Sequence, residues 1–220
     1  MSVLAQDLAL LLLDDDTGRS TVDVGRRHRA VGSAILLDLA RAGRLRVETP
    51  EGRPRDARPV VVDGPPTGDP VLDQALDAVA AKEMKLGWAA ETIGHDSWRP
   101  LLDALVERGL LRHEKGRFLG LVRTNSWPAA DGTHEAEVVG RIRAAVVDGQ
   151  RPDETTVLLV MILRAIGALP AVLSAEDAKS VDERAKRLVE EYERGEGADR
   201  PWREVFKGLD TGLLVVLLAG

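Results

Sequence analysis

Cysteine is absent from the sequence, and aromatic residues are scarce. Without a thiol among the 220 residues, neither a disulfide framework nor a thiolate metal site can form. Aromatic residues make up 3% of the chain, so the core must be built from leucine, valine, alanine and isoleucine. The lack of disulfides fits a reducing compartment, and we expect the protein to be cytoplasmic.

No apolar run approaches the length of a membrane span. The longest runs, such as Leu213 to Ala219, are far shorter than the about 20 residues that a transmembrane helix needs. The apolar N-terminal stretch contains Asp7 and lacks a basic region before it, unlike a signal peptide. We therefore expect a soluble protein that lies, at most, peripherally on the cytoplasmic face of a membrane.

Catalytic and metal-binding patterns are also missing. The four histidines are dispersed, with no pair one helical turn apart, which argues against a zinc site. No glycine-rich loop precedes a lysine in the manner of a phosphate-binding loop. His95, Asp96 and Ser97 have the letters of a catalytic triad, but adjacent residues do not converge from separate elements. We therefore expect that the protein is not an enzyme and holds no metal and no cofactor.

Positive charge, in contrast, is concentrated in one segment. The chain carries a net charge of −6. Residues 19–58 contain ten arginines against five acidic residues, which leaves this segment at about +5 and the rest at about −11. Nucleic acid is not the expected partner of so acidic a chain, whereas a local anion site is compatible with this distribution.

Periodicity and turn residues predict a mainly α fold. Residues 1–220 should form a single globular domain in which apolar central helices are ringed by amphipathic helices, loops and short β-hairpins. Asp69 should cap one helix and Ser97 another, and Gly43 should follow the end of a third. The predicted elements are helices over 3–13, 26–42, 71–81, 98–108, 134–148, 154–167, 175–194 and 209–219, and strands over 44–48, 60–62, 110–112 and 117–122, the last two around a turn at 114–116.

The start of the helix over 26–42 is unusually basic. Arg26, Arg27, His28 and Arg29 lie where the helix dipole disfavours cations. They are either simply solvated or they hold an anion together with the N-terminal amides of the helix.

The segment 99–123 supports two further interpretations. Its helix and hairpin resemble the recognition helix and wing of a winged-helix DNA-binding protein, although Asp103 and Glu107 give the helix a poor surface for phosphates. Its apolar hairpin is either an exposed element for membrane contact or self-association, or it packs on the core. The hairpin residues concerned are Arg117, Phe118, Leu119 and Leu121.

Several segments, taken in order, resemble the Golgi phosphoprotein 3 family. They are LAQDLALLLLDDDTG at 4–18, AILLDLARAGRL at 34–45, PPTGDPVLDQAL at 65–76, LVERGLL at 105–111 with its hairpin, and ERAKRLVEE at 183–191. The resemblance covers nearly the whole chain and implies a mostly helical, non-catalytic single domain. The arginine-rich composition suggests a prokaryotic, bacterial-type member.

The resemblance also implies partners. Eukaryotic members of the family are cytosolic peripheral proteins that bind phosphatidylinositol 4-phosphate on Golgi membranes and the cytosolic tails of glycosyltransferases. It thus implies an adaptor that binds an anionic phospholipid headgroup at a membrane surface and has a protein partner. A homo-oligomer would form through the hairpin at 112–123.

The lipid-pocket residues of the eukaryotic members are not retained. Their Trp and one Arg fall on Asp23 and Gly32, and two further Arg fall on His95 and Trp98. The loss of three arginines and the acid in place of the Trp should weaken phosphate binding. We expect that any rebuilt anion site uses nearby residues, namely Arg26, Arg27, Arg29, His95, Trp98 and Arg99.

Three functions therefore remain open. The first is a peripheral membrane or adaptor protein, the second is a winged-helix-like DNA-binding regulator, and the third is a small-molecule binder that uses the same pocket. The position of the arginines separates the first two. One patch beside an apolar hairpin tip favours a membrane, and a basic helix face favours DNA.

Overall fold

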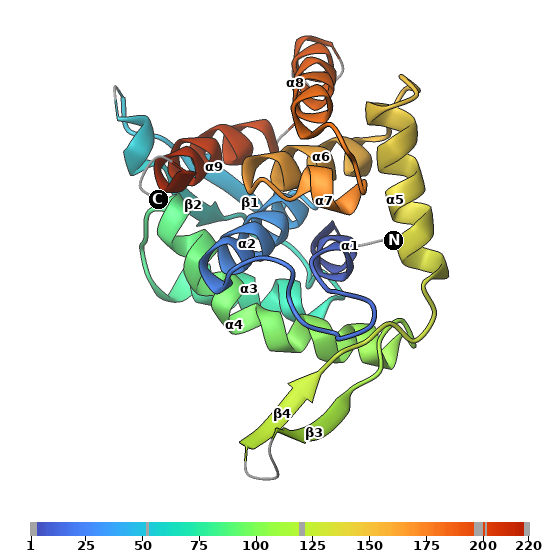
Figure 1. The fold of residues 1–220 in the computed structure, drawn as a ribbon. Helices are drawn as coiled ribbons and strands as arrows, with labels where there is room; N and C mark the ends of the chain where they lie inside the picture. The colour runs from blue at the N-terminus through green and yellow to red at the C-terminus, as the bar shows by residue number, and fades with distance from the viewer. Residues whose placement is uncertain (1–3, 52, 119–121, 196–199, 201, 218–220) are drawn as a thin grey trace.

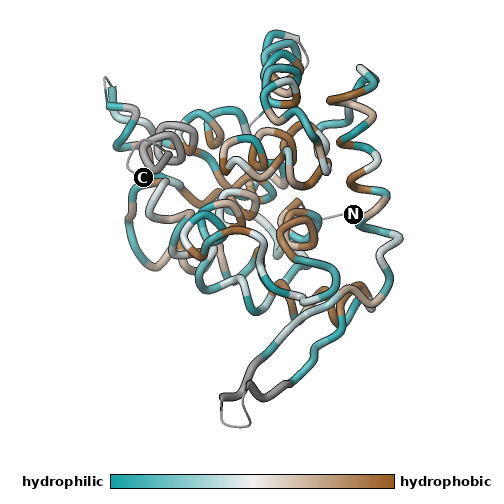
Figure 2. Tube along the Cα trace, in the orientation of Figure 1, coloured by the Kyte–Doolittle hydropathy of each residue, from teal (hydrophilic) through white to brown (hydrophobic). Residues whose placement is uncertain are grey.

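The computed structural model describes residues 4–51, 53–118, 122–195, 200 and 202–217. Over these residues the protein is mainly helical, with nine helices and two small antiparallel sheets, which confirms the predicted fold class (Figure 1). Helices α1 (Leu4–Leu11), α2 (Val24–Arg41) and α6 (Glu154–Ala165) lie near the centre. Apolar residues are concentrated in these helices (Figure 2).

Burial along the central helices agrees with the predicted aliphatic core. Every residue of α1 is buried, as is α2 from Ala30 to Ala40. α6 is buried without interruption over 156–163. Its apolar residues lie on all sides because other helices surround it. Aliphatic side chains fill most of this core, and Trp202 is the largest fully buried side chain among the described residues.

α4 (Leu86–Glu107) lies along α2 and runs antiparallel to it. Glycine is present on both sides of this contact. A Cβ added to Gly32 would lie 1.8 Å from the carbonyl oxygen of Ala90, and one added to Gly94 would lie 1.7 Å from that of His28. The two backbones therefore touch, and the first turns of α2 lie beside the middle of α4.

The predicted helix start at Ser97 is wrong. α4 begins eleven residues earlier, at Leu86, and passes through Ser97, which is 2% exposed. Apolar residues at Ala90, Ile93 and Leu101 share the buried face with Ser97, so packing against α2 overrides the capping tendency of serine. Pro100 is tolerated inside the helix although it has no N–H group to donate.

The second hairpin is shifted relative to the prediction. β3 (Glu114–Phe118) pairs with β4 (Val122–Ser126), so residues 114–116 lie in a strand and not in the turn. The predicted strand over 110–112 contributes only an isolated bridge between Leu111 and Ala129. Leu111 is buried in a small apolar cluster, and this anchors the base of the hairpin and moves the ladder along the chain.

Local chain signals account for much of the remaining architecture. β1 (Leu45–Glu48) pairs with β2 (Arg58–Val61), and Gly43 follows α2 with a φ of +68°, as its predicted position requires. Asp69 caps α3 (Pro70–Ala81) by accepting from the amides of Val71 and Leu72. The other helices are α5 (Thr133–Val146), α7 (Leu169–Val172), α8 (Ala178–Arg194) and α9 (Trp202–Leu217), and a short 3-10 turn spans Pro54–Asp56.

α9 begins earlier than predicted. Trp202, Val205 and Leu209 follow helical spacing and are all buried, which adds two turns ahead of the predicted start at 209. None of the helices within the described part of the chain is both long and apolar enough to cross a membrane.

Candidate functional site

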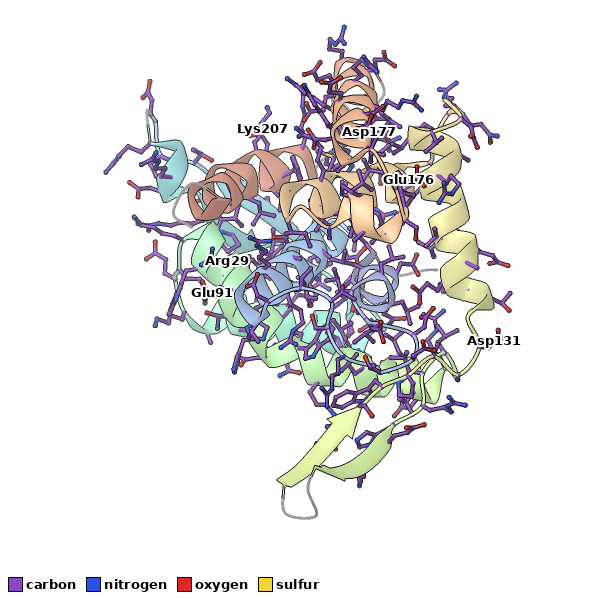
Figure 3. All side chains as sticks on the ribbon, in the orientation of Figure 1. Arg29, Glu91, Asp131, Glu176, Asp177 and Lys207 are labelled. Carbon is purple, nitrogen blue, oxygen red and sulfur yellow. The ribbon has the colours of Figure 1, made fainter. Side chains whose placement is uncertain are left out.

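Some of the arginines at the start of α2 are paired with a carboxylate and others are not. Asp23 is the N-cap of α2 and accepts from the amide of Arg26 at 3.0 Å. The same carboxylate lies 3.2 Å from the Arg26 guanidinium. Arg29 points toward Glu91 of α4, at 3.2 Å (Figure 3). Arg26 and Arg29 are therefore each paired with an acid.

Arg27 differs from its neighbours. Its guanidinium lies over the ring of Trp98, 4.5 Å from the ring centroid, and donates to Nε2 of His28 at 3.2 Å. No carboxylate among the described residues pairs with it, and its buried Nε has no hydrogen-bond partner. Burial lowers the pKa of the Arg27 guanidinium, yet arginine remains charged at neutral pH. Arg27 is thus a partly buried cation without an anion.

Two histidines complete this arrangement. The rings of His28 and His95 meet edge to face with centroids 5.1 Å apart. Burial, followed by the charges of Arg27 and His95, lowers the pKa of His28 below its usual range. Because an arginine can only donate, Nε2 of His28 must accept, which places the proton of the neutral ring on Nδ1. We call Arg27, His28, His95 and Trp98 the α2–α4 cluster.

The structure brings together only part of the predicted site. Arg27, His95 and Trp98 meet in the α2–α4 cluster, whereas Arg99 leaves it. Arg99 donates to Asp103 at 2.9 Å and lies over the ring of Trp127, 4.8 Å from its centroid. The sequence places His28 in the basic start of α2, but not among the six residues expected to rebuild the anion site. In the structure His28 adjoins Arg27 and meets the ring of His95, which lies one helical turn before Trp98. Their approach depends on the glycine contact between the helices, which no local pattern indicates.

The four positions that correspond to the family lipid pocket do not all lie in the same place. Asp23, His95 and Trp98 lie at the N-terminal end of α2 or on the part of α4 beside it. Gly32 lies within the contact between α2 and α4, where a side chain would overlap the backbone of Ala90. An arginine at this position is incompatible with the observed packing.

The apolar hairpin residues are only partly described. Leu119 and Leu121 lie outside the described residues, and nothing is described of the side chains of Arg117 and Phe118, whose backbones belong to β3. The hairpin itself projects from the body of the molecule (Figure 1). A role in membrane contact or self-association stays a prediction.

His95, Asp96 and Ser97 do not converge as a triad. His95 Nδ1 lies 2.7 Å from a carboxylate oxygen of Asp96, and both side chains are exposed, whereas Ser97 is buried. No group of three or more potential metal ligands occurs in the described ranges of the chain. What the α2–α4 cluster offers chemically is a held cation beside an aromatic ring, which suits binding of an anion.

Comparison with known protein families identifies a family to which the chain is similar. The family model described as Golgi phosphoprotein 3 matches residues 4–208. No curated protein matched the chain in a sequence search. The match covers most of the chain, including both helices of the α2–α4 cluster and every segment on which the resemblance in the sequence rests. The chain therefore belongs to the Golgi phosphoprotein 3 family.

Proposed function

We propose that the protein is a non-catalytic, peripheral membrane or adaptor protein that binds the phosphate of an anionic lipid headgroup at the α2–α4 cluster. The observation that carries this proposal is the Arg27 guanidinium, which is partly buried against Trp98 and lacks a carboxylate partner among the described residues. Membership of the Golgi phosphoprotein 3 family supports the same class of ligand. Phosphatidylinositol 4-phosphate, the lipid of the eukaryotic members, is the first candidate.

Side chains, not the helix amides, would provide the binding energy. The carboxylate of Asp23 already accepts from the amide of Arg26 at the start of α2. A phosphate would instead accept charge-assisted hydrogen bonds from Arg27 and from His95, whose side chain is exposed. With one unpaired arginine in the cluster, we expect weaker discrimination among anionic lipids than a pocket with three arginines would give.

Exposed apolar residues flank the α2–α4 cluster. Val24, in the first turn of α2, is 57% exposed, and Trp88, near the start of α4, is 49% exposed. Trp88, Glu91 and His95 follow helical spacing along one face of α4. Tryptophan is favoured at the membrane–water interface, so Trp88 would contact the bilayer surface beside the bound headgroup. The hairpin at 112–123 would add a further contact or join two copies.

The test is co-sedimentation with three kinds of vesicle: neutral, generically anionic, and containing phosphatidylinositol 4-phosphate. We expect binding to the anionic vesicles and about a tenfold loss for Arg27→Gln. Arg26→Gln is the matched control, because it removes the same charge one residue away from an arginine that Asp23 already neutralises. If no vesicle binds the protein, or if both variants lose equally, the proposed site is wrong.

Comparison of binding to the three kinds of vesicle also measures the selectivity of the protein among lipids. Preference for phosphatidylinositol 4-phosphate would mean that the pocket has been rebuilt from other residues, and equal binding to all anionic vesicles would mean that the site reads charge alone. Competition by soluble inositol phosphates separates a lipid site from a small-molecule site with the same chemistry.

The DNA-binding alternative gains no support from the packing. The segment proposed as a recognition helix is the C-terminal part of α4, in which Leu101, Leu102 and Leu105 are buried. The charges of Arg99 and Asp103 on its exposed face pair with each other. Such a face has little net attraction for phosphates.

A further inference from the structure

α8 separates two clefts. It projects from the body of the molecule beside α5 (Figure 1), and only Val181 and Ala185 of its residues are buried. One face of α8 lines a cleft with the C-terminal end of α5 and the loop at 149–152, and the other lines a cleft with α6 and α9. The two faces differ in how their charges are balanced.

On the side of α6 and α9, acidic residues of α8 face cations. Arg164 of α6 lies 2.8 Å from Asp182, and Lys186 lies 3.9 Å from Glu190. α9 contributes Arg203 and Lys207 to the same cleft. The charges on this face are therefore matched within the protein.

On the side of α5, the arginines of α8 lack such partners. Arg184 donates to the carbonyl oxygen of Val147, at the end of α5, at 3.3 Å, which leaves most of its five donors unused. Arg187 has no hydrogen-bond or ion-pair partner in the described part of the chain. Arg151 lines this cleft from the loop, and Glu191 is the one acid among the lining residues. The cleft has an excess of positive charge.

The same cleft has an apolar wall. Val146 is buried, while Leu188 and Tyr192 are partly buried along α8. The ring of Tyr192 is stacked on Trp202 with centroids 6.2 Å apart, which fixes its position. The cleft encloses about 660 Å³, which lies within the range of small-molecule sites.

We propose that the cleft between α5 and α8 binds a small amphiphilic organic anion. Its carboxylate, sulfonate or phosphate group would lie on Arg184 and Arg187, and its aromatic or aliphatic body would lie against Leu188 and Tyr192. This site shares no residue with the α2–α4 cluster, so it does not depend on the proposed function.

The probe is anilinonaphthalene sulfonate, an aryl anion whose fluorescence rises in an apolar site, titrated into the full chain. We expect saturable binding to one site, weakened about tenfold by Arg187→Gln and by Arg184→Gln. Lys186→Gln is the matched control, because it removes one charge from the opposite face of α8. The uncharged analogue phenylnaphthylamine should bind at least tenfold more weakly than the sulfonate.

Several outcomes would overturn the proposal. They are the absence of saturable binding, equal weakening by Lys186→Gln and Arg187→Gln, and equal affinity for the charged and uncharged probes. Thermal unfolding of each variant shows whether a lost signal reflects the cleft or the fold. If Arg187→Gln unfolds at a lower temperature than the unmodified protein, Arg187→Lys takes its place. Arg187→Lys keeps the charge, and its affinity for the sulfonate should lie between those of the unmodified protein and Arg187→Gln.

Discussion

Single carboxyl groups in this protein differ widely in their surroundings. Glu135, near the start of α5, faces the acidic turn after α1. Burial, and then the hydrogen bond and the negative charge of Asp15, raise the pKa of Glu135 to about 8. Burial also raises the pKa of Asp38 to about 6, against the opposing effects of the Ala5 amide and Arg41. Both groups therefore hold a proton above the pH at which an unfolded chain would release it.

The stability of the protein should consequently fall as the pH rises. A carboxyl group whose folded pKa is raised stabilises the fold fully below its unfolded pKa, near 4.5 for Glu135, and this stabilisation is lost as the pH passes about 8. Glu135→Gln keeps a donor toward Asp15 and does not titrate. Chemical denaturation between about pH 5 and about pH 8 should give a flatter profile for this variant. Parallel profiles for the two proteins would contradict the assignment.

The cap of α3 gives a second test at the same scale. Asp69 accepts from the amides of Val71 and Leu72 and from the side chain of Gln6. Asp69→Ala should lower the free energy of unfolding by about 1 to 2 kcal/mol, measured in urea. Asp77→Ala, on the exposed surface of the same helix, is the control and should have little effect.

The pairing of α2 and α4 is the contact between elements on which the candidate site depends. Gly94→Ala should destabilise the protein by about 3 kcal/mol or more, because its Cβ would overlap the His28 carbonyl and force the helices apart. Gly87→Ala, in the same helix, meets open space and should stabilise the protein by up to about 1 kcal/mol. Thermal unfolding of the two variants measures the difference, and similar melting temperatures would rule out the close contact.

Elements could be predicted from the sequence where their signals are local. Asp69 and Gly43 act on amides and dihedral angles within a few residues, so the sequence was sufficient to place them. Ser97 carried the same kind of signal, but burial against α2 decided its conformation instead. The ladder of β3 and β4 was misplaced because the buried anchor at Leu111 is a contact between distant segments.

The predicted anion site shows the same limit. The sequence predicted that Arg27, His95 and Trp98 belong to one site, and the three lie in one cluster, but that this cluster binds an anion stays a prediction. The sequence could not show which arginines are neutralised, because Arg29 pairs with Glu91 of α4, which is 62 residues away along the chain. His28 meets His95 because the two backbones touch.

The whole molecule combines a net charge of −6 with a local basic segment, so its attraction to an anionic membrane should be short-ranged. Raising the salt concentration from about 0.05 M to about 0.3 M should weaken binding to anionic vesicles several-fold. Trp88→Ala should weaken binding by a similar factor at both salt concentrations, because the contact proposed between Trp88 and the bilayer would be apolar. Co-sedimentation of both proteins in both buffers tests this, and a loss for Trp88→Ala seen only at low salt would contradict it.

The glycine contact between α2 and α4 also limits how the α2–α4 cluster can vary among relatives or be redesigned. A relative with a bulky residue at position 32 or 94 must carry α4 along another path, and so must present other side chains to the start of α2. The headgroup specificity of the proposed site would thus be a property of a helix pair and not of single positions. Transplanting it between relatives would require the exchange of residues 23–41 and 86–107 as one unit, because no point substitution at Gly32 leaves its neighbour in place.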